Sequence, residues 1–521
     1  MGGSSHPARR AQLNCQSARQ SAAHQRQDSA SRITSSAMEG HVTDVKTYQQ
    51  FIGGEWVDAV SGETLAVENP ANYQVVARVP SSGEEDVNRA VDAAAKAFET
   101  WSLTTPQDRS LALLKIADIF EANSDELGRI EASQTGKPVD FAIGEMAVAV
   151  DLFRFFAGAC RVMDGLAVNE FLPGHTAMVR RDPIGVVASI APWNYPLYMA
   201  AWKLGPALAT GNTVVLKPSA RTPLSALRFA ELIGDQLPAG VLNVLSGSGG
   251  TMGDLLVGHP KVRMVSITGD TVTGKHIASV AAGTVKRLHL ELGGKAPVIV
   301  LDDADVALAA ETIKGAGYFN SGQDCTAACR VIAGPAVYEK LVAALAEQVG
   351  SINWGDPTTR DDLEMGSLIA KAQADKVEGM VNRALEGKAE LVVGGKRPDM
   401  VGAYFQPTLI TNPDQGSEIV QDEVFGPVVT VQRAVDEEQA IAWANDVKFG
   451  LASSVFTGSI AKAMRVARRL QFGTVWVNEH VILASENPHG GVKESGWGKD
   501  GSKYALEDYT YVKNITINTG I

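Results

Sequence analysis

The chain has 521 residues, of which 45% are apolar and 20% are charged, and its formal net charge is −12. This length is enough for two or three domains with a large core, and the composition is ordinary for a globular enzyme. The negative charge argues against nucleic acid or an anionic membrane surface as the main partner.

Two further properties narrow the class of protein. Four cysteines in a chain of this length form no disulfide framework. No apolar run reaches the ~18 residues of a membrane span, because prolines and an asparagine interrupt the longest candidate. We therefore expect a reduced environment, either the cytoplasm or an organellar matrix.

Residues 1–45 differ in composition from the rest of the chain. They hold five arginines and many serines, few acidic residues and no apolar periodicity, which predicts a disordered leader. The same composition is typical of a mitochondrial transit peptide, which would place the protein in the matrix. Two other origins stay open, a leader added for expression and translation begun upstream of a true start at Met38.

From residue 48 the pattern is that of a folded protein. Residues 51–57 predict a hairpin, and residues 81–101 predict a helix with acids in its first turn. Two more helices are predicted over residues 108–138 and another over residues 145–162. Residues 176–185 are expected to be extended.

The middle of the chain alternates short apolar strands with helices. The strands are predicted at residues 186–192, 213–219, 241–247 and 262–269, and the helices at residues 198–211, 223–240, 249–259 and 271–283. Such alternation predicts a doubly wound α/β domain with a parallel sheet covered on both faces. A second α/β run follows residue 325, and no internal repeat is present. The β-prone terminal stretch, residues 507–520, needs an edge strand as partner, and another subunit could supply it.

The segment FNSGQDCTAACR, residues 319–330, contains the candidate nucleophile Cys325. The cysteine follows a glycine-containing turn and precedes an Ala-rich segment that is compatible with a helix. A helix N-terminus there would favour the thiolate, which is the reactive form. Glu291 in HLELGGK offers a carboxylate that could act as base. Cys329 is expected to pack within the helix and has no metal-ligand cluster around it.

Several predicted strand ends carry residues suited to a nucleotide. Lys217 could bind a ribose hydroxyl or a phosphate, and Gly247, Gly249 and Gly269 allow the backbone to approach a phosphate. The glycine fingerprint is incomplete, because Met252 occupies the place of its third glycine. Three successive predicted strands that end in such residues nevertheless indicate dinucleotide binding.

Seven motifs resemble those of the aldehyde dehydrogenase superfamily in order and spacing. They are PWNYP, KPS, ITG, LELGGK, GQDC, EVFGPVV and PHGGVKESGWG, and the resemblance covers about residues 46–517. It implies an α/β aldehyde dehydrogenase fold of three parts. These are a variant Rossmann domain of five strands that binds NAD, an α/β catalytic domain and a β oligomerisation arm. The implied boundaries are 46–164 with 184–293, then 294–500, and 165–183 with 501–517.

The resemblance also implies a mechanism. Cys325 attacks the aldehyde carbon, and the Asn194 amide with the Cys325 backbone N–H holds the oxyanion. Hydride passes to the nicotinamide, which leaves a thioester on the cysteine. Glu291 then activates the water that hydrolyses this thioester to a carboxylate. A homodimer or homotetramer is the expected assembly, and no metal is implied.

The cofactor residues follow from the same motifs. The implied contacts are Ile190, Ala191, Pro192, Trp193, Lys217, Ser219, Ala220, Gly249, Gly269, Asp270, Thr273, Glu423 and Phe425. Two of these depart from the usual pattern. Ala220 stands where many members have a glutamate that repels the 2′-phosphate of NADP, and Arg221 follows it. Asp270 replaces a serine near the pyrophosphate, where a carboxylate costs binding unless it turns away. NAD is the expected cofactor, with NADP possible.

The substrate end most resembles the γ-aminobutyraldehyde dehydrogenases, which neighbour the betaine aldehyde enzymes. The residues expected there are Glu145, Tyr195, Trp202, Asp324 and His489. Aromatic rings attract an ammonium by cation–π contact, and the acids add negative charge. These features predict an ω-aminoaldehyde such as 4-aminobutanal, the product being 4-aminobutanoate, an intermediate expected in polyamine degradation.

Three alternatives stay open at this point. A betaine aldehyde dehydrogenase would take a trimethylated analogue of the same kind of substrate. A semialdehyde dehydrogenase for an anionic substrate needs an arginine near the acyl tail, where the sequence has acids and aromatics. A non-catalytic binding or structural member of the fold should have lost Cys325 or Glu291, and both are present. An enzyme that passes the thioester to coenzyme A would have no use for Glu291.

Overall fold

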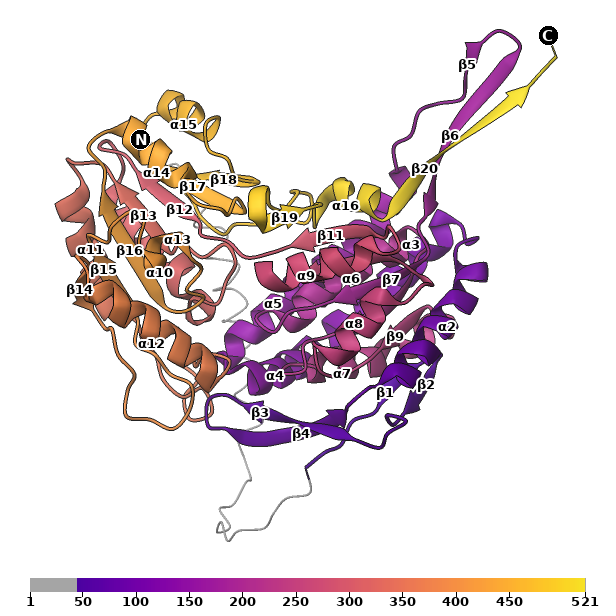
Figure 1. Cartoon of the computed structure of the whole chain (residues 1–521), viewed down its shortest axis with the longest axis horizontal. Helices are drawn as coiled ribbons and strands as arrows, with labels where there is room; N and C mark the ends of the chain where they lie inside the picture. Colours follow the sequence, from indigo (N-terminus) through magenta and orange to yellow (C-terminus); the bar gives the residue numbers. More distant parts are fainter. Residues whose placement is uncertain (1–44, 521) are drawn as a thin grey trace, which may run out of the picture. The chain divides into compact units, whose positions relative to one another are not determined.

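The computed structural model describes residues 45–520 (Figure 1). The predicted leader, residues 1–45, lies outside this range except for its last residue. The described part begins with the predicted hairpin of β1 (Gln50–Ile52) and β2 (Glu55–Val57) and continues with a second hairpin of β3 (Thr64–Asn69) and β4 (Gln74–Pro80). No helix in this part of the chain is both long and apolar enough to cross a membrane.

The first sheet has five parallel strands at its centre. Its order is β19-β11-β10-β7-β8-β9-β1-β2, and the run from β11 to β9 is parallel throughout. The antiparallel β1 and β19 extend it on either side. The strands of the sheet not yet given are β7 (Val186–Ile190), β8 (Thr213–Lys217), β9 (Leu242–Val244), β10 (Val262–Thr268), β11 (Arg287–Glu291) and β19 (Gly496–Trp497).

Helices cover both faces of this sheet, as the alternation predicts. Val186 and Ala188 pack into one apolar cluster with α2, α8 and α9, whereas Val187 between them packs into another cluster with α3, α5, α6 and α7. The helices are α2 (Glu84–Trp101), α3 (Pro106–Ala122), α4 (Ser124–Thr135), α5 (Val139–Ala159), α6 (Pro196–Ala209), α7 (Leu224–Ile233), α8 (Thr251–Gly258) and α9 (Thr271–Ala282). Short 3₁₀ turns follow α5 and α7 as η1 (Cys160–Val162) and η2 (Gly234–Gln236).

The second sheet repeats the layered arrangement. Its order is β14-β15-β16-β13-β12-β17-β18, with only β14 antiparallel. The strands are β12 (Pro297–Val300), β13 (Arg330–Ala333), β14 (Glu390–Val393), β15 (Thr408–Thr411), β16 (Val428–Arg433), β17 (Ala452–Phe456) and β18 (Thr474–Val477). The helices of this part are α10 (Val306–Tyr318), α11 (Tyr338–Gly350), α12 (Lys371–Leu385), α13 (Glu418–Gln421), α14 (Glu437–Asn445) and α15 (Ile460–Ala467). Two 3₁₀ turns, η3 (Phe319–Gly322) and η4 (Lys493–Ser495), complete the set.

The terminal strand finds its partner within the same chain. After α16 (Ser502–Asp508), β20 (Thr510–Asn518) pairs antiparallel with β6 (His175–Pro183), which also pairs with β5 (Asn169–Leu172). Figure 1 shows β20 (yellow) running beside β6 (purple). The terminal strand thus pairs with β6 of the same chain, in place of the strand from another subunit that the sequence suggested. Both strands fall largely within the segments 165–183 and 501–517, which the resemblance groups together.

The helix expected after Cys325 is absent from the described residues. The Asp324 side chain accepts hydrogen bonds from the Thr326 N–H and hydroxyl, which closes a local turn, and the chain then enters β13. Because β13 is hydrogen-bonded to β12 and β16, sheet pairing overrides the helix propensity of the alanines. The prediction that Cys329 packs within a helix is therefore wrong as well.

The turn before Cys325 adopts an unusual backbone conformation. Asn320, Ser321 and Gly322 have φ angles of 48°, 57° and 66° in succession. Side chains hold this conformation, since Asn320 donates to the Asn194 and Gln323 carbonyls and Ser321 donates to the Gly366 and Ser367 carbonyls. Left-handed residues of this kind cost free energy and persist only where surrounding contacts enforce them.

We predict that Gly322→Ala destabilises the protein and displaces Cys325. A Cβ at this position would lie 2.1 Å from the Gly426 carbonyl oxygen. The expected loss is at least about 1–3 kcal/mol in the free energy of unfolding, measured by denaturant titration. Gly315→Ala is the matched control. Its Cβ meets nothing within 4 Å and it lies inside α10, so it should stabilise by about 0.4–1 kcal/mol. Equal stability of the two variants would contradict this account of the turn.

Candidate active site

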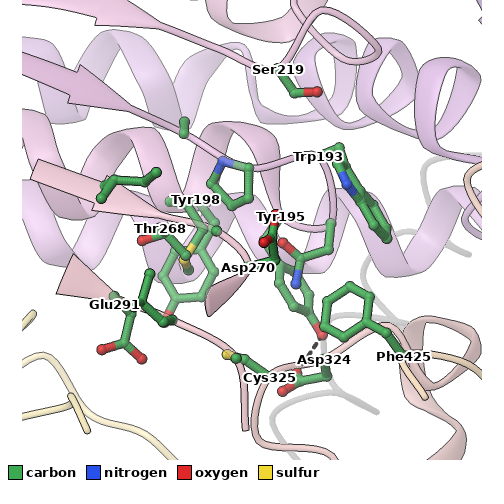
Figure 2. Close-up of a pocket in the computed structure, with 18 of the residues that line it drawn as sticks. Trp193, Tyr195, Tyr198, Ser219, Thr268, Asp270, Glu291, Asp324, Cys325 and Phe425 are labelled. Carbon is green, nitrogen blue, oxygen red and sulfur yellow. Dashed lines mark hydrogen bonds between the residues drawn. The ribbon is translucent and has the colours of Figure 1, made fainter. Parts of the chain in front are cut away.

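One cavity of about 790 Å³ is lined by every catalytic, cofactor and substrate residue that the motifs imply, from Glu145 to His489. Gly247, also named for a possible phosphate contact, is not part of this lining. The cavity lies at the carboxyl ends of β7, β8, β10 and β11, where ligands of parallel sheets bind. Figure 2 shows Cys325 in this cavity, with Glu291 and Asp324 on either side of it in this view.

The Cys325 thiol sits in an environment that opposes ionisation. Burial raises its pKa well above the ordinary value, and the carboxylates of Asp324, Glu291 and Glu423 raise it further. This differs from the sequence-based expectation of a thiolate favoured by a helix N-terminus, because a turn and β13 follow the cysteine instead of a helix. The nucleophile therefore needs a base close by.

Glu291 is placed to be that base. It is the last residue of β11 and is 1% exposed, and neither carboxylate oxygen has a hydrogen-bond partner within residues 45–520. One oxygen lies 3.3 Å from His489 Nε2. Ligand atoms of Glu291, His489 and Cys325 all lie within 4.8 Å of one another. This position, next to the thiol in a buried cavity, is the one that a general base requires.

Asn194 lies in the loop after β7, which also reaches Cys325. It is buried in the turn between β7 and α6, and its side-chain amide donates to the Gln323 carbonyl at 3.1 Å. An amide has two N–H groups, so one stays available for a ligand. The Cys325 backbone N–H donates to no carbonyl in the described part of the chain. Both groups could therefore stabilise an oxyanion near Cys325.

The cofactor end of the cavity contains a buried cation, a carboxylate and two rings. Lys217 ends β8 and is 4% exposed, and burial lowers its pKa to about 8. Glu423 accepts a hydrogen bond from the Gly294 N–H at 2.8 Å, and burial raises its pKa to about 7. The rings of Trp193 and Phe425 meet edge to face with centroids 5.2 Å apart. Ile190, Ala191, Pro192, Ser219, Ala220, Gly249 and Gly269 complete this lining.

Asp270 is less repulsive to a phosphate than its charge suggests. It caps the N-terminus of α9, where its carboxylate accepts from the Thr273 N–H at 2.9 Å and from the Thr273 hydroxyl at 2.7 Å. The carboxylate is thus turned onto the helix, which stabilises an N-terminal negative charge.

A second cavity of about 680 Å³ adjoins the cofactor end. Ala220, Arg221 and Gly249 line both cavities, and Lys371 lines the second. Both cationic side chains are exposed. A cofactor that extends past Lys217 would reach two positive charges here.

The substrate end combines acids with aromatic rings. Asp324 accepts three hydrogen bonds, one from the Tyr195 hydroxyl at 2.6 Å and two from Thr326. Tyr195 and Trp202 are both buried, and Trp202 packs against the rings of Tyr198 and His489, each with a centroid separation of 5.1 Å. Tyr195 therefore fixes Asp324 at the wall of the cavity.

Glu145 lines the substrate end of the cavity, but its carboxylate is already paired. Both its oxygens accept from Lys137 Nζ, at 2.8 and 2.7 Å, and both side chains are buried. Burial raises the pKa of Glu145 to about 8, although Lys137 opposes the shift. Lys137 also lies 4.3 Å from the centroid of the Tyr195 ring. The acid expected at the mouth of the pocket is thus already paired within the protein.

Sequence reasoning missed several lining residues. Tyr198 and Met199 share a face of α6 with Trp202, and the helical spacing from Tyr195 could have revealed them. Gln373 and Lys376 reach the cavity from α12, where they donate to the Phe425 and Glu423 carbonyls. No local signal marks these two residues, because only the folded chain brings α12 to this loop. Other lining residues are Val148, Thr268, Leu292, Gly293, Phe319, Thr326, Val481, Ile482 and Leu483.

Known proteins resemble this chain over most of its length. The model of the aldehyde dehydrogenase family matches residues 56–515. The mitochondrial succinate-semialdehyde dehydrogenase of Arabidopsis thaliana is 40% identical over 470 residues, which are 90% of this chain and 89% of that protein. The betaine aldehyde dehydrogenase of Bacillus subtilis is 39% identical over 476 residues, which are 90% of this chain and 97% of that protein.

A solved structure agrees with the computed fold. The betaine aldehyde dehydrogenase of Staphylococcus aureus, in complex with NAD⁺, is 41% identical and has a TM-score of 0.89, covering 91% of this chain and 95% of that one. The α/β fold expected from the motifs is therefore confirmed. By its sequence, its fold and the placing of Cys325, Glu291 and Asn194 around one cavity, the chain belongs to the aldehyde dehydrogenase family.

Proposed function

We propose that this protein oxidises an ω-aminoaldehyde such as 4-aminobutanal to the carboxylate, with NAD as the cofactor. The observation that carries the proposal is the make-up of the substrate end, where Asp324 is held by Tyr195 among aromatic rings. Among the described residues that line the cavity, the one arginine is Arg221 at the opposite, cofactor end. This environment suits a positively charged tail.

The residues around Cys325 account for the first half of the reaction. Glu291 takes the thiol proton, because the thiol does not ionise readily beside three carboxylates. The sulfur then attacks the aldehyde carbon, and the Asn194 amide and Cys325 N–H stabilise the oxyanion. When bound, the nicotinamide accepts the hydride that leaves a thioester on Cys325.

Glu291 also accounts for the second half. Once the thiol proton has passed from Glu291 to solvent, the carboxylate can accept a proton from the water molecule that attacks the thioester. The departing Cys325 thiolate takes that proton back from Glu291, and the product leaves as a carboxylate after losing its own proton to solvent. One Glu291 oxygen lies 3.3 Å from His489 Nε2, and no other hydrogen-bond donor within the described residues holds the carboxylate. This favours hydrolysis over transfer to coenzyme A.

The proposed dinucleotide would bind in this cavity with its nicotinamide at the cysteine. Lys217, buried and cationic at the end of β8, is suited to ribose hydroxyls, and Glu423 is suited to the second ribose. The solved relative from Staphylococcus aureus is in complex with NAD⁺. We propose NAD as the preferred cofactor and Arg221 as the residue that would admit NADP.

Two relatives suggest competing substrates. Succinic semialdehyde carries an anionic tail, and a buried cation at the substrate end, Lys137, is already paired with Glu145. Betaine aldehyde carries a trimethylammonium group, which the rings of Tyr195 and Trp202 could also attract. Initial rates for 4-aminobutanal, betaine aldehyde, succinic semialdehyde and butanal decide among them. Faster turnover of the anionic substrate would refute the proposal.

The assembly, a homodimer or homotetramer, and the cytoplasmic or matrix location remain proposals.

We predict that Glu291→Gln slows both halves of the reaction. A glutamine can take neither the thiol proton nor the proton of the attacking water, so NADH should form without a burst and turnover should fall about 10²–10⁴-fold. Rapid-mixing absorbance measures this with 4-aminobutanal. Cys325→Ala is the control, which should bind NAD and form no NADH. A burst of NADH followed by slow turnover would mean that another group removes the thiol proton and that Glu291 serves the water step alone.

We predict that Asp324→Asn raises KM for 4-aminobutanal about tenfold, or ~1.4 kcal/mol, and leaves KM for butanal within about twofold. Asparagine preserves much of the shape and removes the charge. The ratio of the two KM values cancels any change in Cys325 reactivity. Glu145→Gln is the matched comparison. Because it leaves Lys137 buried and unpaired, it should lower thermal stability as well. Equal effects of Asp324→Asn on both aldehydes would remove the charge argument.

We predict that Arg221→Ala weakens NADP more than NAD. A 2′-phosphate placed beyond Lys217 would meet Arg221, whereas a 2′-hydroxyl gains little from it. The expected rise is about five- to tenfold in KM for NADP, with KM for NAD nearly unchanged. Lys388→Ala, at an exposed lysine paired with Asp414, is the control for the loss of one surface charge.

A further inference from the structure

Three possible metal ligands of different chemical kinds meet at the nucleophile. One oxygen of Glu291, the Cys325 sulfur and one nitrogen of His489 lie within 4.8 Å of one another. These residues are far apart in the sequence, so no motif spacing points to a metal. We propose that they form a site for Zn²⁺ or a similar borderline-soft divalent cation, which occupies the active centre and blocks it reversibly.

The donor set matches zinc rather than the hard cations. Zn²⁺ takes cysteine sulfur, histidine nitrogen and carboxylate oxygen, and three protein ligands with one open position are common. Bonds of ~2.0–2.3 Å place tetrahedral ligands roughly 3.3–3.8 Å apart. The Glu291–His489 separation of 3.3 Å already lies in this range. The remaining separations close with a shift of roughly 1 Å, which side-chain rotation can supply. Mg²⁺ and Ca²⁺ prefer oxygen ligands only.

Burial supplies the second argument for a cation. Glu291 is 1% exposed and His489 is 2% exposed. One Glu291 oxygen lies 3.3 Å from His489 Nε2, and the other has no hydrogen-bond partner in the described part of the chain. A buried carboxylate with so few donors is costly, and a bound cation would relieve this cost. Asp324 and Glu423 add negative charge around the sulfur. The site thus offers buried ligands in negatively charged surroundings.

Metal binding would make both reacting groups, the Cys325 sulfur and the Glu291 carboxylate, unavailable for catalysis at the same time. The S–H bond breaks, its proton passes to solvent, and the sulfur, the carboxylate and the imidazole bind the metal without any change of oxidation state. The cysteine can then no longer attack, and Glu291 can no longer act as base. His489 Nδ1 has no partner among the described residues. Histidines that bind zinc usually donate their second ring N–H to a hydrogen-bond partner. Because His489 lacks one in this part of the chain, we expect moderate affinity for Zn²⁺ and release of the metal to a chelator.

The decisive experiment measures metal binding directly, without substrate. Chelator-treated full-length protein is titrated with Co²⁺, and the thiolate-to-cobalt charge-transfer absorption is followed, then displaced with Zn²⁺. We expect one equivalent per chain, a band that is absent in Cys325→Ala, and affinity at least tenfold weaker in His489→Phe and Glu291→Gln. Cys329→Ala is the matched control and should bind as the original protein does. Activity of the original protein should fall with Zn²⁺ and return with EDTA.

Two results would overturn the proposal. One is an unchanged Co²⁺ affinity in His489→Phe, which would mean that Co²⁺ binds the thiol without the histidine. The other is loss of the charge-transfer band in Cys329→Ala. His489→Gln serves as a second variant where thermal unfolding shows that His489→Phe is not folded. The inhibition measurement rests on the aldehyde dehydrogenase activity, whereas the absorption measurement does not. Failure of the substrate proposal and failure of the metal site are therefore distinguishable.

Discussion

The parallel direction of β7, β8, β10 and β11 is the constraint on which the site depends. Parallel strands end at the same edge of their sheet, so residues that follow four separate strands are brought to one place. Asn194 follows β7, Lys217 ends β8, Asp270 follows β10 and Glu291 ends β11. The nucleophile comes from the other sheet, where the left-handed turn at residues 320–322 directs the chain into β13. Both sheets must therefore be complete before Cys325 can meet Glu291 and Asn194.

The electrostatics of the cavity follow from this convergence. A thiol among Asp324, Glu291 and Glu423 in a buried setting stays protonated, which protects it from oxidation and makes its reactivity conditional on the base. The same carboxylates make the cavity hospitable to positive charge, whether on the tail of a substrate or on a metal ion. The pairing of Lys137 with Glu145 limits this effect, because one acid and one cation at the substrate end neutralise each other.

Most of the fold and most of the lining of the site could be predicted from the sequence. The physical reason is different for the fold and for the site. Short apolar strands alternating with helices leave few arrangements, and the motifs around Asn194, Glu291 and Cys325 are specific. The failures have a common cause, since each depends on a distant partner. Residues 326–329 look helical but lead into β13, and Glu145, expected to add negative charge at the substrate end, is paired with Lys137. The contribution of α12 through Gln373 and Lys376 also depends on contacts that no local pattern encodes.

The pairing of β20 with β6 has a consequence for the order of assembly. Their nine residue pairs join segments separated by roughly 330 positions. At ~5–20 residues per second, β20 is made roughly 15–60 s after β6 during synthesis. Throughout that time one edge of β6 carries unpaired N–H and C=O groups, while its other edge can pair with β5. The nascent chain is thus open to wrong strand pairing at β6 until β20 has been made.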